Sequence, residues 1–375
     1  MAQPAVAQQA VAAALQGALD AAAVPAIAGF LVRRDGTLWQ GAAGAATTAS
    51  RAFLASMSKA VTSVAALVLV QQGRLALDEP VGRWVEELAA PLVLEGFDAA
   101  GEPVLRPARV PITLRHLLTH TAGFGYPFFN DRLLRFSQLR PPRRPVALFD
   151  AGTQWEYGIN TDWVAKVVAA AAAKPFEDVV REVVLEPLGM TRTGYEFPAD
   201  RLGVHARQAD GSLVTVANEP PRRREFFQGG AGLCGSGPDY GRFLRMLLGG
   251  GALDGRRVLR PELVELLFTD QLPGVSPDLV AGPLRPVQPE ITLAREIFPG
   301  MVAGWSLAGA INPAPLPSGR AAGSLGWAGI ANTYFWADRS RDLAGVLLMQ
   351  FYPFGDPAAL AALAAFETAA YAALG

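Results

Sequence analysis

Ser56 and Lys59 lie three residues apart, and they could serve as a nucleophile and a neighbouring base. Residues three apart on a helix share a face, so the Ser56 hydroxyl and the Lys59 amine could touch. A lysine carried into an apolar interior loses affinity for its proton and can act as a base near neutral pH. The pair therefore predicts acyl transfer through a serine ester, the chemistry of S-x-x-K motifs.

The surrounding sequence favours this interpretation over a structural one. The segment after Lys59, AVTSVAALVLV, carries no charge, so it should form a helix that is buried on nearly all sides. Arginine supplies most of the positive charge, which makes a lysine inside an apolar segment unusual here. The alternative is an N-cap serine followed by a lysine that extends to solvent, and the motif alone leaves it open.

Two further segments could complete a site. Tyr157 lies in a loop before a predicted helix and could take the serine proton, with the nearby ammonium group favouring the phenolate. An aromatic residue in such a loop more often has only a packing role. Gly326–Ile330 lies between strand-like segments, and its backbone N–H could pair with that of Ser56 as an oxyanion hole. A glycine-rich hairpin around a core tryptophan, Trp327, is equally compatible with this segment.

Other reactive residue types form no recognisable site. His116 and His120 are four apart, but no glutamate follows His116, so no metal site is expected and both read as structural. Cys234 is the single cysteine; it carries no signature of a catalytic thiol and fits a reducing compartment. A phosphate-binding glycine loop is lacking, and no cofactor is expected.

Composition narrows the class of protein. The chain has 375 residues, is 51% hydrophobic and 18% charged, and has a net charge of −1. This length allows two packed subdomains, and the charge balance indicates no nucleic-acid partner. The alanine-rich N-terminus lacks the basic region of a signal peptide, and no run is long enough to cross a bilayer. We therefore expect a cytoplasmic protein without a membrane partner.

The sequence predicts strands near both ends of the chain and helices in between. A hairpin should turn at Asp35–Gly36, and later strands at Gly326 and at Asp338–Arg341. This order predicts an α/β (α+β) fold with a central antiparallel sheet closed by both termini and a mostly helical inserted subdomain. Besides the helix of Ser56, helices are predicted at 5–23, 161–173, 175–185, 238–249, 260–268 and 357–373.

Three segments rich in proline or glycine interrupt this pattern. Residues 91–112 should be irregular or a small hairpin, and 272–300 should be a loop. The basic segment within 127–146, whose core is 132–145, is predicted to be a solvated surface loop, with a substrate lid as the alternative.

With the serine-lysine pair, the tyrosine and the GWAGI segment in this order, the chain resembles the serine β-lactamase-like superfamily. Within it, the chain is most similar to the family VIII carboxylesterases, relatives of class C β-lactamases and penicillin-binding proteins. The similar segments cover nearly the whole chain and are PITLRHLLTHTAGFGY (111–126), QWEYGINTDWVAKVV (154–168), LEPLGMTRT (185–193), GGAGLCGSGPDYGRFLRMLLGGG (229–251) and GWAGIANTYFWAD (326–338).

The resemblance implies a β-lactamase/transpeptidase-like fold. Residues 1–80 and 300–375 would form an α/β subdomain, 81–299 a mostly helical insertion, and the site would lie between them. Ser56 would be the acylated nucleophile, and Lys59 and Tyr157 would share proton transfer with it.

The resemblance also implies the rest of the site. The backbone N–H groups of Ser56 and Ile330 would hold the oxyanion, and Trp327, Gly329 and Asn160 would line the substrate pocket. Two departures matter. Trp327 stands where lactamases usually have a lysine for the substrate carboxylate, which favours neutral esters. The asparagine of the Y-x-N pattern comes one residue late, as Asn160.

Together these features predict a cofactor-free serine carboxylesterase that hydrolyses small to medium acyl esters through an acyl-enzyme on Ser56. Transfer of the acyl group to another alcohol is a variant of the same chemistry. A β-lactamase or D-amino-acid peptidase and a non-catalytic penicillin-receptor-like binding protein stay open as alternatives. The natural substrate, the stereochemical preference and the oligomeric state are not predicted.

Overall fold

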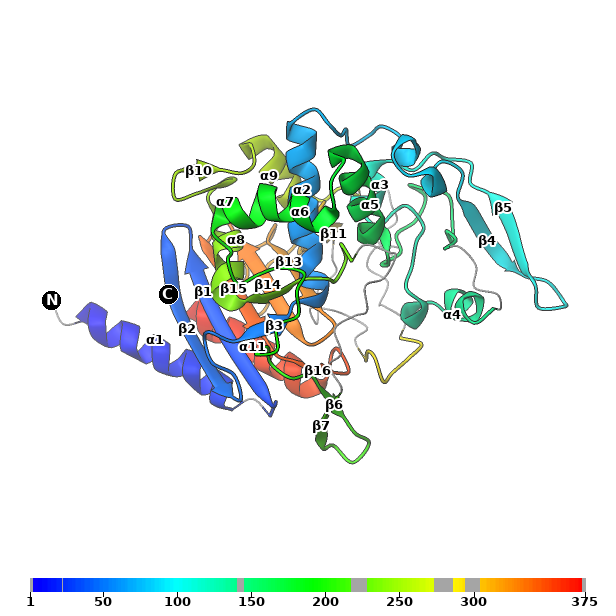
Figure 1. Cartoon of the computed structure of the whole chain (residues 1–375). Coiled ribbons are helices and arrows are strands. Elements are labelled where there is room, and N and C mark those ends of the chain that lie inside the picture. The colour runs from blue at the N-terminus through cyan, green and yellow to red at the C-terminus, as the bar shows by residue number, and fades with distance from the viewer. Residues whose placement is uncertain are drawn as a thin grey trace.

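An antiparallel sheet of seven strands lies at the centre of the molecule (Figure 1). The structure is a computed structural model that describes residues 3–21, 23–139, 145–216, 228–272, 286–293 and 304–372. The seven strands are β1 (Ala26–Arg33), β2 (Gly36–Gly44), β11 (Gly304–Trp305), β12 (Ala310–Ile311), β13 (Leu325–Gly329), β14 (Thr333–Asp338) and β15 (Leu343–Leu348). They lie side by side in the order β11-β12-β13-β14-β15-β1-β2.

Segments from both ends of the chain pair inside this sheet. β1 pairs with β15, with Phe30 opposite Val346, and both strands are antiparallel to each other. Side chains of a strand point alternately to its two faces, and Phe30 accordingly joins one apolar core while Ile27 and Leu31 join another. The predicted antiparallel sheet closed by the two terminal segments is confirmed.

Two terminal helices cover one face of the sheet. α1 (Gln3–Asp20) and α11 (Pro357–Ala372) pack on each other, and Figure 1 shows them beside the same strands. Leu19 of α1 and Phe366 of α11 share an apolar core with Trp336 of β14.

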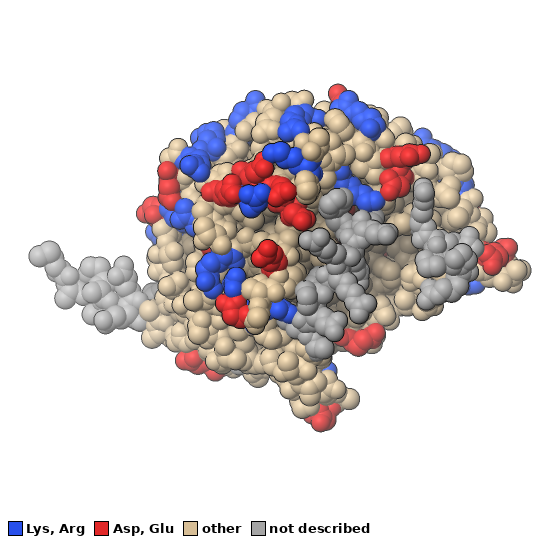
Figure 2. Space-filling model, in the orientation of Figure 1, with Lys and Arg blue, Asp and Glu red and all other residues tan. Residues whose placement is uncertain are grey.

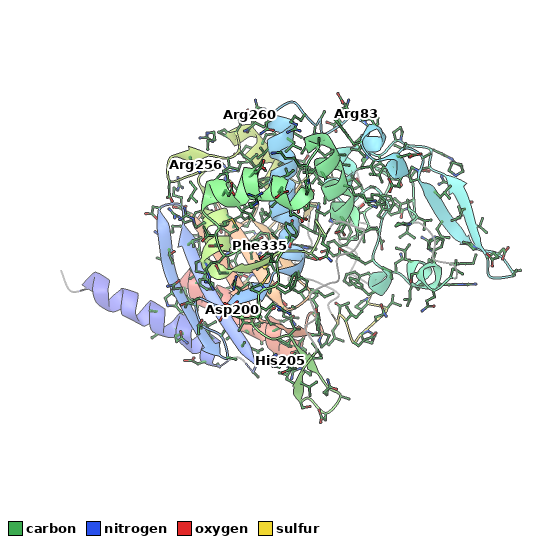
Figure 3. All side chains as sticks on the ribbon, viewed as in Figure 1. Arg83, Asp200, His205, Arg256, Arg260 and Phe335 are labelled. Carbon is green, nitrogen blue, oxygen red and sulfur yellow. The ribbon has the colours of Figure 1, made fainter. Side chains whose placement is uncertain are left out.

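The other face carries the helix of the serine-lysine pair. α8 (Gly237–Leu248) packs on β1 and β15, and its Tyr240 ring lies 5.3 Å from that of Phe335 in β14, centroid to centroid. Figure 3 labels Phe335 in the middle of the molecule. α2 (Ser58–Gln71) belongs to the same core, and its residues 58–69 are all buried, as the uncharged segment after Lys59 predicts.

Helices from the middle of the chain pack against α2. α5 (Asn160–Ala172) packs along α2 and also contacts α3 (Leu114–Leu118). A single bent helix follows, made of α6 (Phe176–Val180), a π-helical turn (Arg181–Leu185) and α7 (Glu186–Leu188). Two further helices are α4 (Asp131–Ser137) and α9 (Pro261–Phe268).

Small sheets complete the fold. Next to the serine, β3 (Arg51–Phe53) pairs with β8 (Cys234–Ser236). The other pairs are β4 (Leu92–Phe97) with β5 (Pro103–Pro107), β9 (Ala252–Leu253) with β10 (Arg256–Arg257), and β6 (His205–Arg207) with both β7 (Leu213–Thr215) and β16 (Phe351–Tyr352). The β4–β5 pair is the small hairpin predicted within 91–112.

Most predicted helices are confirmed to within about two residues, with two differences elsewhere. Gly326 is not a turn: it lies inside β13 and pairs with Ala310 and Trp336. Its neighbours Leu325 and Trp327 are buried in the apolar core, so the strand continues through the glycine. The strands turn instead after Gly329.

The proline-broken segment is not a plain loop either. It contains α4, whose Leu133 and Phe136 are buried in a small apolar core with Leu94 and Phe149. Residues 140–144 and most of 272–300 lie outside the described residues. The division into 1–80 with 300–375 and 81–299 stays a prediction; α8, inside the second range, packs on the sheet.

Charged side chains of both signs are mixed over the face in Figure 2. Surface charges of the molecule form ion pairs, as Lys174 does with Glu182 and Arg181 does with Asp178 and Glu186. Among the described helices, none is long and apolar enough to pass through a bilayer.

Candidate active site

Ser56 lies just before the buried helix α2 and is partly accessible. It lies in a short 3₁₀ turn (Ala55–Met57) that runs directly into α2. In the fully described segment from Leu54 to Leu69, Ser56 is the only residue that is not buried. The preceding residue, Ala55, has a φ of +49°, a left-handed conformation that costs a non-glycine residue on the order of 1 kcal/mol.

The strained turn is held by its neighbours. Leu54 donates its N–H to Leu233 O at 2.9 Å and accepts at its carbonyl from the Thr333 hydroxyl at 3.2 Å. A Cβ on Gly329 would clash with Leu54 O, so only glycine lets the end of β13 approach this closely. The close approach sets the backbone conformation that presents Ser56.

Lys59 lies directly beneath the serine. It is only 2% exposed, and its Nζ donates to Ser56 Oγ at 3.0 Å, to Gly230 O at 2.8 Å and to Tyr126 Oη at 3.2 Å. The predicted helical contact between the serine and lysine is therefore present. Three acceptors match the three hydrogen atoms of an ammonium group.

A carboxylate supports the lysine through the backbone. Asp162, in the first turn of α5, accepts at Oδ1 from Gly230 N at 3.0 Å, and the carbonyl of the same glycine accepts from Lys59. Gly229, the preceding residue, accepts from the Thr62 hydroxyl of α2 at 2.7 Å. The 229–230 backbone thus joins α2 to α5 behind the lysine.

Tyr157 lies beside Lys59. The Lys59 Nζ is 4.8 Å from the centroid of the Tyr157 ring, and the Tyr157 hydroxyl accepts from Trp327 Nε1 at 3.0 Å. Trp327 is 4% exposed and packs edge-on against Trp305, with 4.4 Å between centroids. The structure therefore brings the predicted Ser56, Lys59, Tyr157 and Trp327 together.

A second tyrosine of the site, Tyr126, was not predicted. Its hydroxyl accepts from Lys59, and its ring lies 5.4 Å from that of Tyr157, nearly edge to face. Burial raises the pKa of Tyr126 well above its ordinary value, and Asp162 and Tyr157 act in the same direction. Tyr126 ends a segment that carried the family resemblance, but nothing in its local sequence marks it as a site residue.

Asn160 is placed differently from the predicted pocket wall. It is fully buried at the start of α5, and its Nδ2 donates to Phe124 O at 2.7 Å and to His120 Nδ1 at 2.9 Å. These contacts use both hydrogen atoms of the amide inside the protein. The amide nitrogen thus holds the scaffold around Tyr157.

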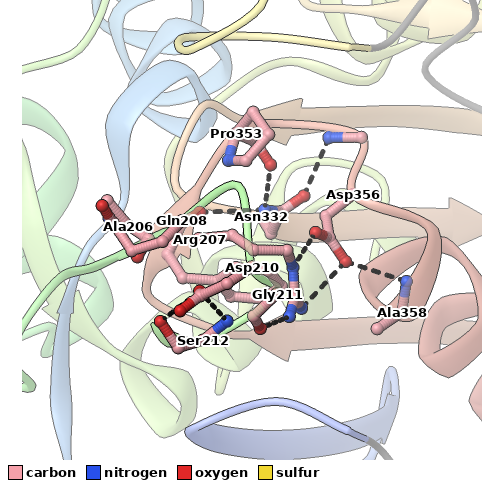
Figure 4. A network of polar contacts seen from close by, with 12 residues as sticks. Ala206, Arg207, Gln208, Asp210, Gly211, Ser212, Asn332, Pro353, Asp356 and Ala358 are labelled. Atoms are coloured by element: carbon pink, nitrogen blue, oxygen red, sulfur yellow. Dashed lines mark hydrogen bonds and ion pairs between the residues drawn. The ribbon is translucent and has the colours of Figure 1, made fainter. Parts of the chain in front are cut away.

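The predicted oxyanion residue Ile330 follows Gly329, next to the serine turn. The amide of Asn332 fixes the turn that begins at Ile330: Nδ2 donates to Phe351 O and Pro353 O, both at 2.9 Å, and Oδ1 accepts from Gly355 N at 3.0 Å. Figure 4 shows Asn332 with Pro353 and Asp356. Nearby, Asp356 pairs with Arg207 of β6 and accepts from Ala358 N at the start of α11. Binding of an oxyanion by the Ser56 and Ile330 amides stays a prediction.

His116 and Cys234, the other reactive side chains considered in the sequence, lie outside the group of site residues around Ser56. His116 Nδ1 accepts from Thr113 N at 3.2 Å in a capping box at the start of α3. Cys234 is buried in β8, which raises the pKa of its thiol to about 11. Within the described ranges, no three His, Cys, Asp or Glu side chains are grouped as metal ligands would be.

Comparison with known proteins agrees with this geometry. A family model described as Beta-lactamase matches residues 11–370. Monacolin J acid methylbutanoyltransferase of Aspergillus terreus is 32% identical over 85% of this chain and 81% of its own length, and lovastatin esterase of Penicillium rubens is 29% identical over 80% and 79%. An acyltransferase of Monascus pilosus is 36% identical, and the match spans 58% of this chain and 57% of that protein. Among solved structures, unliganded simvastatin synthase from Aspergillus terreus superposes with a TM-score of 0.84 at 28% identity, covering 99% of both chains.

Proposed function

The chain belongs to the beta-lactamase family of serine hydrolases and acyltransferases and has a β-lactamase/transpeptidase-like fold. We propose that it hydrolyses carboxylic esters through an acyl-enzyme on Ser56. The observation that carries the proposal is the 3.0 Å bond between the partly buried serine hydroxyl and the buried Lys59 amine. The amine holds the hydroxyl and lies 4.8 Å from the centroid of the Tyr157 ring, which supports Tyr157 as the acceptor of the serine proton.

The reaction begins when Ser56 Oγ attacks the ester carbonyl carbon. Its proton passes to Tyr157, with Lys59 keeping the phenolate favourable, and the Ser56 and Ile330 amides hold the oxyanion. When the tetrahedral intermediate collapses, the C–O bond to the alcohol breaks and the proton leaves with the alcohol. Water then attacks the acyl-enzyme and gives its proton to the same base, which returns it to Ser56 as the acid leaves.

The aromatic surroundings support neutral substrates of the family VIII esterase kind. Trp327 occupies the place of the lactamase lysine, and it is buried against Trp305 and Tyr157, all of them uncharged rings. A substrate carboxylate would lose solvation there, and Trp327 offers it no charge in place of the lactamase lysine. Small and medium acyl esters are therefore the proposed substrates, with no cofactor and no nucleic-acid or membrane partner. The cytoplasm, suggested by the single cysteine, is the proposed location.

Acyl transfer to an alcohol is the second candidate function. The methylbutanoyltransferase and the Monascus acyltransferase are similar over much of this chain, while the lovastatin esterase is a hydrolase by name. Both reactions share the acyl-enzyme and differ only in whether water or an alcohol accepts the acyl group. The proposal therefore leaves two acceptors of the acyl group, water and an alcohol, for experiment to distinguish.

The test is turnover of p-nitrophenyl butyrate by the purified protein beside Ser56→Ala, with and without an added alcohol. We expect turnover that the mutation removes while the thermal unfolding transition persists. An ester product formed with the alcohol would identify the transferase, and hydrolysis of a chromogenic cephalosporin the lactamase. Equal turnover in both proteins would refute Ser56 as the nucleophile, and a stable acyl adduct without turnover would indicate a binding protein.

A further inference from the structure

His120 is a fully buried histidine that the proposed reaction does not use. It follows α3 in the left-handed conformation, with a φ of +57°. Its Nδ1 accepts from the backbone N–H of Gly158 at 3.3 Å and from Asn160 Nδ2 at 2.9 Å. Because a backbone N–H can only donate, Nδ1 carries no proton, and the proton of the neutral ring lies on Nε2.

The two bonds to the backbone enclose the reactive tyrosine. Glu156 donates its N–H to His120 O at 2.9 Å, and Gly158 donates its N–H to His120 Nδ1. Tyr157 is the residue between these two donors, and its ring lies 4.9 Å from the imidazole. One residue therefore holds the chain immediately before and immediately after Tyr157.

The surroundings keep the imidazole neutral. Burial, followed by the charge of Lys59, holds the pKa of His120 well below its ordinary value. Trp305 stands perpendicular to the ring at 5.0 Å, and among the described residues Nε2 has no hydrogen-bond partner. A second proton would have to sit on Nδ1, where it would face the hydrogen atoms of Gly158 and Asn160.

We propose that His120 is a positioning residue for Tyr157: as a neutral acceptor it clamps the 156–160 backbone, so that the phenol stays at Lys59 and Trp327. This inference rests on the proposed function. A catalytic group displaced by about 1 Å can cost roughly 100-fold in rate, so the clamp should show in kcat more than in substrate binding.

Two substitutions separate the acceptor from the rest of the side chain. In His120→Asn, the amide oxygen takes the place of Nδ1, and asparagine tolerates the left-handed backbone. In His120→Gly, the backbone is equally free but the acceptor is gone. The matched control is His116→Ala, because His116 Nδ1 also accepts from a backbone N–H, that of Thr113, at the start of α3, the helix that precedes His120.

The measurements are kcat and KM on p-nitrophenyl butyrate, the acylation burst, and thermal unfolding for each variant. We expect kcat to fall roughly 30- to 100-fold in His120→Gly with KM changed by less than about threefold, and to recover most of this loss in His120→Asn. The control should lose stability and keep its kcat. Equal kcat in the two His120 variants, or in folded His120→Gly and wild type, would overturn the inference.

A spectroscopic measurement covers the case in which His120→Gly does not fold. The nitrogen-15 spectrum of the wild-type protein should show His120 as the neutral Nε2–H form at pH 6, and a proton on Nδ1 would overturn the inference. Ser56→Ala separates this test from that of the function. If Ser56→Ala keeps its turnover, the function fails; if Ser56 is required and His120→Gly behaves as wild type, only the clamp fails.

Discussion

The indole N–H of Trp327 donates to the hydroxyl of Tyr157 across 3.0 Å, joining residues 170 positions apart in the chain. The bond leaves the phenol oxygen with a fixed donor on one side and Lys59 near its ring. A donor aimed at this oxygen stabilises negative charge on it. Trp327 therefore fixes the position of the Tyr157 hydroxyl beside Lys59.

Replacing Trp327 by phenylalanine tests this bond. A hydrogen bond to a charged group is worth about 1.5–3 kcal/mol, so Trp327→Phe should lower kcat by roughly 10- to 100-fold. Trp305→Phe is the matched control, because the Trp305 N–H donates to a backbone carbonyl, Leu118 O, at 3.1 Å. Steady-state kinetics should show a kcat loss in the first variant alone. Similar losses in both would mean that packing explains the effect.

The two tyrosines at Lys59 should differ in their effect on acylation. Burial raises the pKa of Tyr126, which favours its protonated phenol over a role as the base. We expect Tyr157→Phe to slow the acylation burst by about 100-fold or more, and Tyr126→Phe by about 10-fold through the lost bond to Lys59. Stopped-flow measurement of the burst decides the point. A larger loss of acylation rate in Tyr126→Phe than in Tyr157→Phe would identify Tyr126 as the base.

Gly329→Ala should damage the protein in two ways. The new methyl group would clash with Leu54 O and the Thr333 hydroxyl, so the free energy of unfolding should fall by about 1–3 kcal/mol. Relief of the clash would move the strained Ala55 turn, so kcat should fall as well. Gly36→Ala is the control, because nothing lies within 4 Å of a methyl group there. Urea unfolding with parallel kinetics checks both effects, and wild-type kcat in Gly329→Ala would contradict the second.

Stability should fall as the pH drops below about 6.5. Burial lowers the pKa of both His116 and His120 in the folded state, whereas the unfolded chain binds their protons near the ordinary value of 6.5. The unfolded state thus binds more protons, and the stabilisation present above pH 6.5 is lost toward the lower folded pKa. Urea unfolding between pH 5 and 8 should show His120→Asn with a shallower slope, by up to about 1.4 kcal/mol per pH unit. If the free energy of unfolding of His120→Asn and of the wild type changed equally with pH, His120 would not be the cause of the pH dependence.

Local sequence patterns predicted those parts of the site that lie within one element. The serine-lysine pair could be predicted because both residues lie within one helical turn, and α2 because the eleven residues after Lys59 carry no charge. Tyr126 and His120 could not be, because their partners Lys59 and Gly158 are 67 and 38 residues away and meet them only after folding. Likewise, the left-handed Ala55 depends on the approach of β13, which no local pattern encodes.

The pairing of β1 with β15 has a consequence for biosynthesis. The edge of β1 that accepts β15 stays open while some 300 residues are translated, and the turn before Ser56 lacks β13 for nearly as long. Contacts of such large sequence separation form late and leave an apolar strand exposed on the nascent chain. The nucleophile is therefore assembled only after the last strands leave the ribosome, and a chain stalled before them carries Ser56 and Lys59 without a working site.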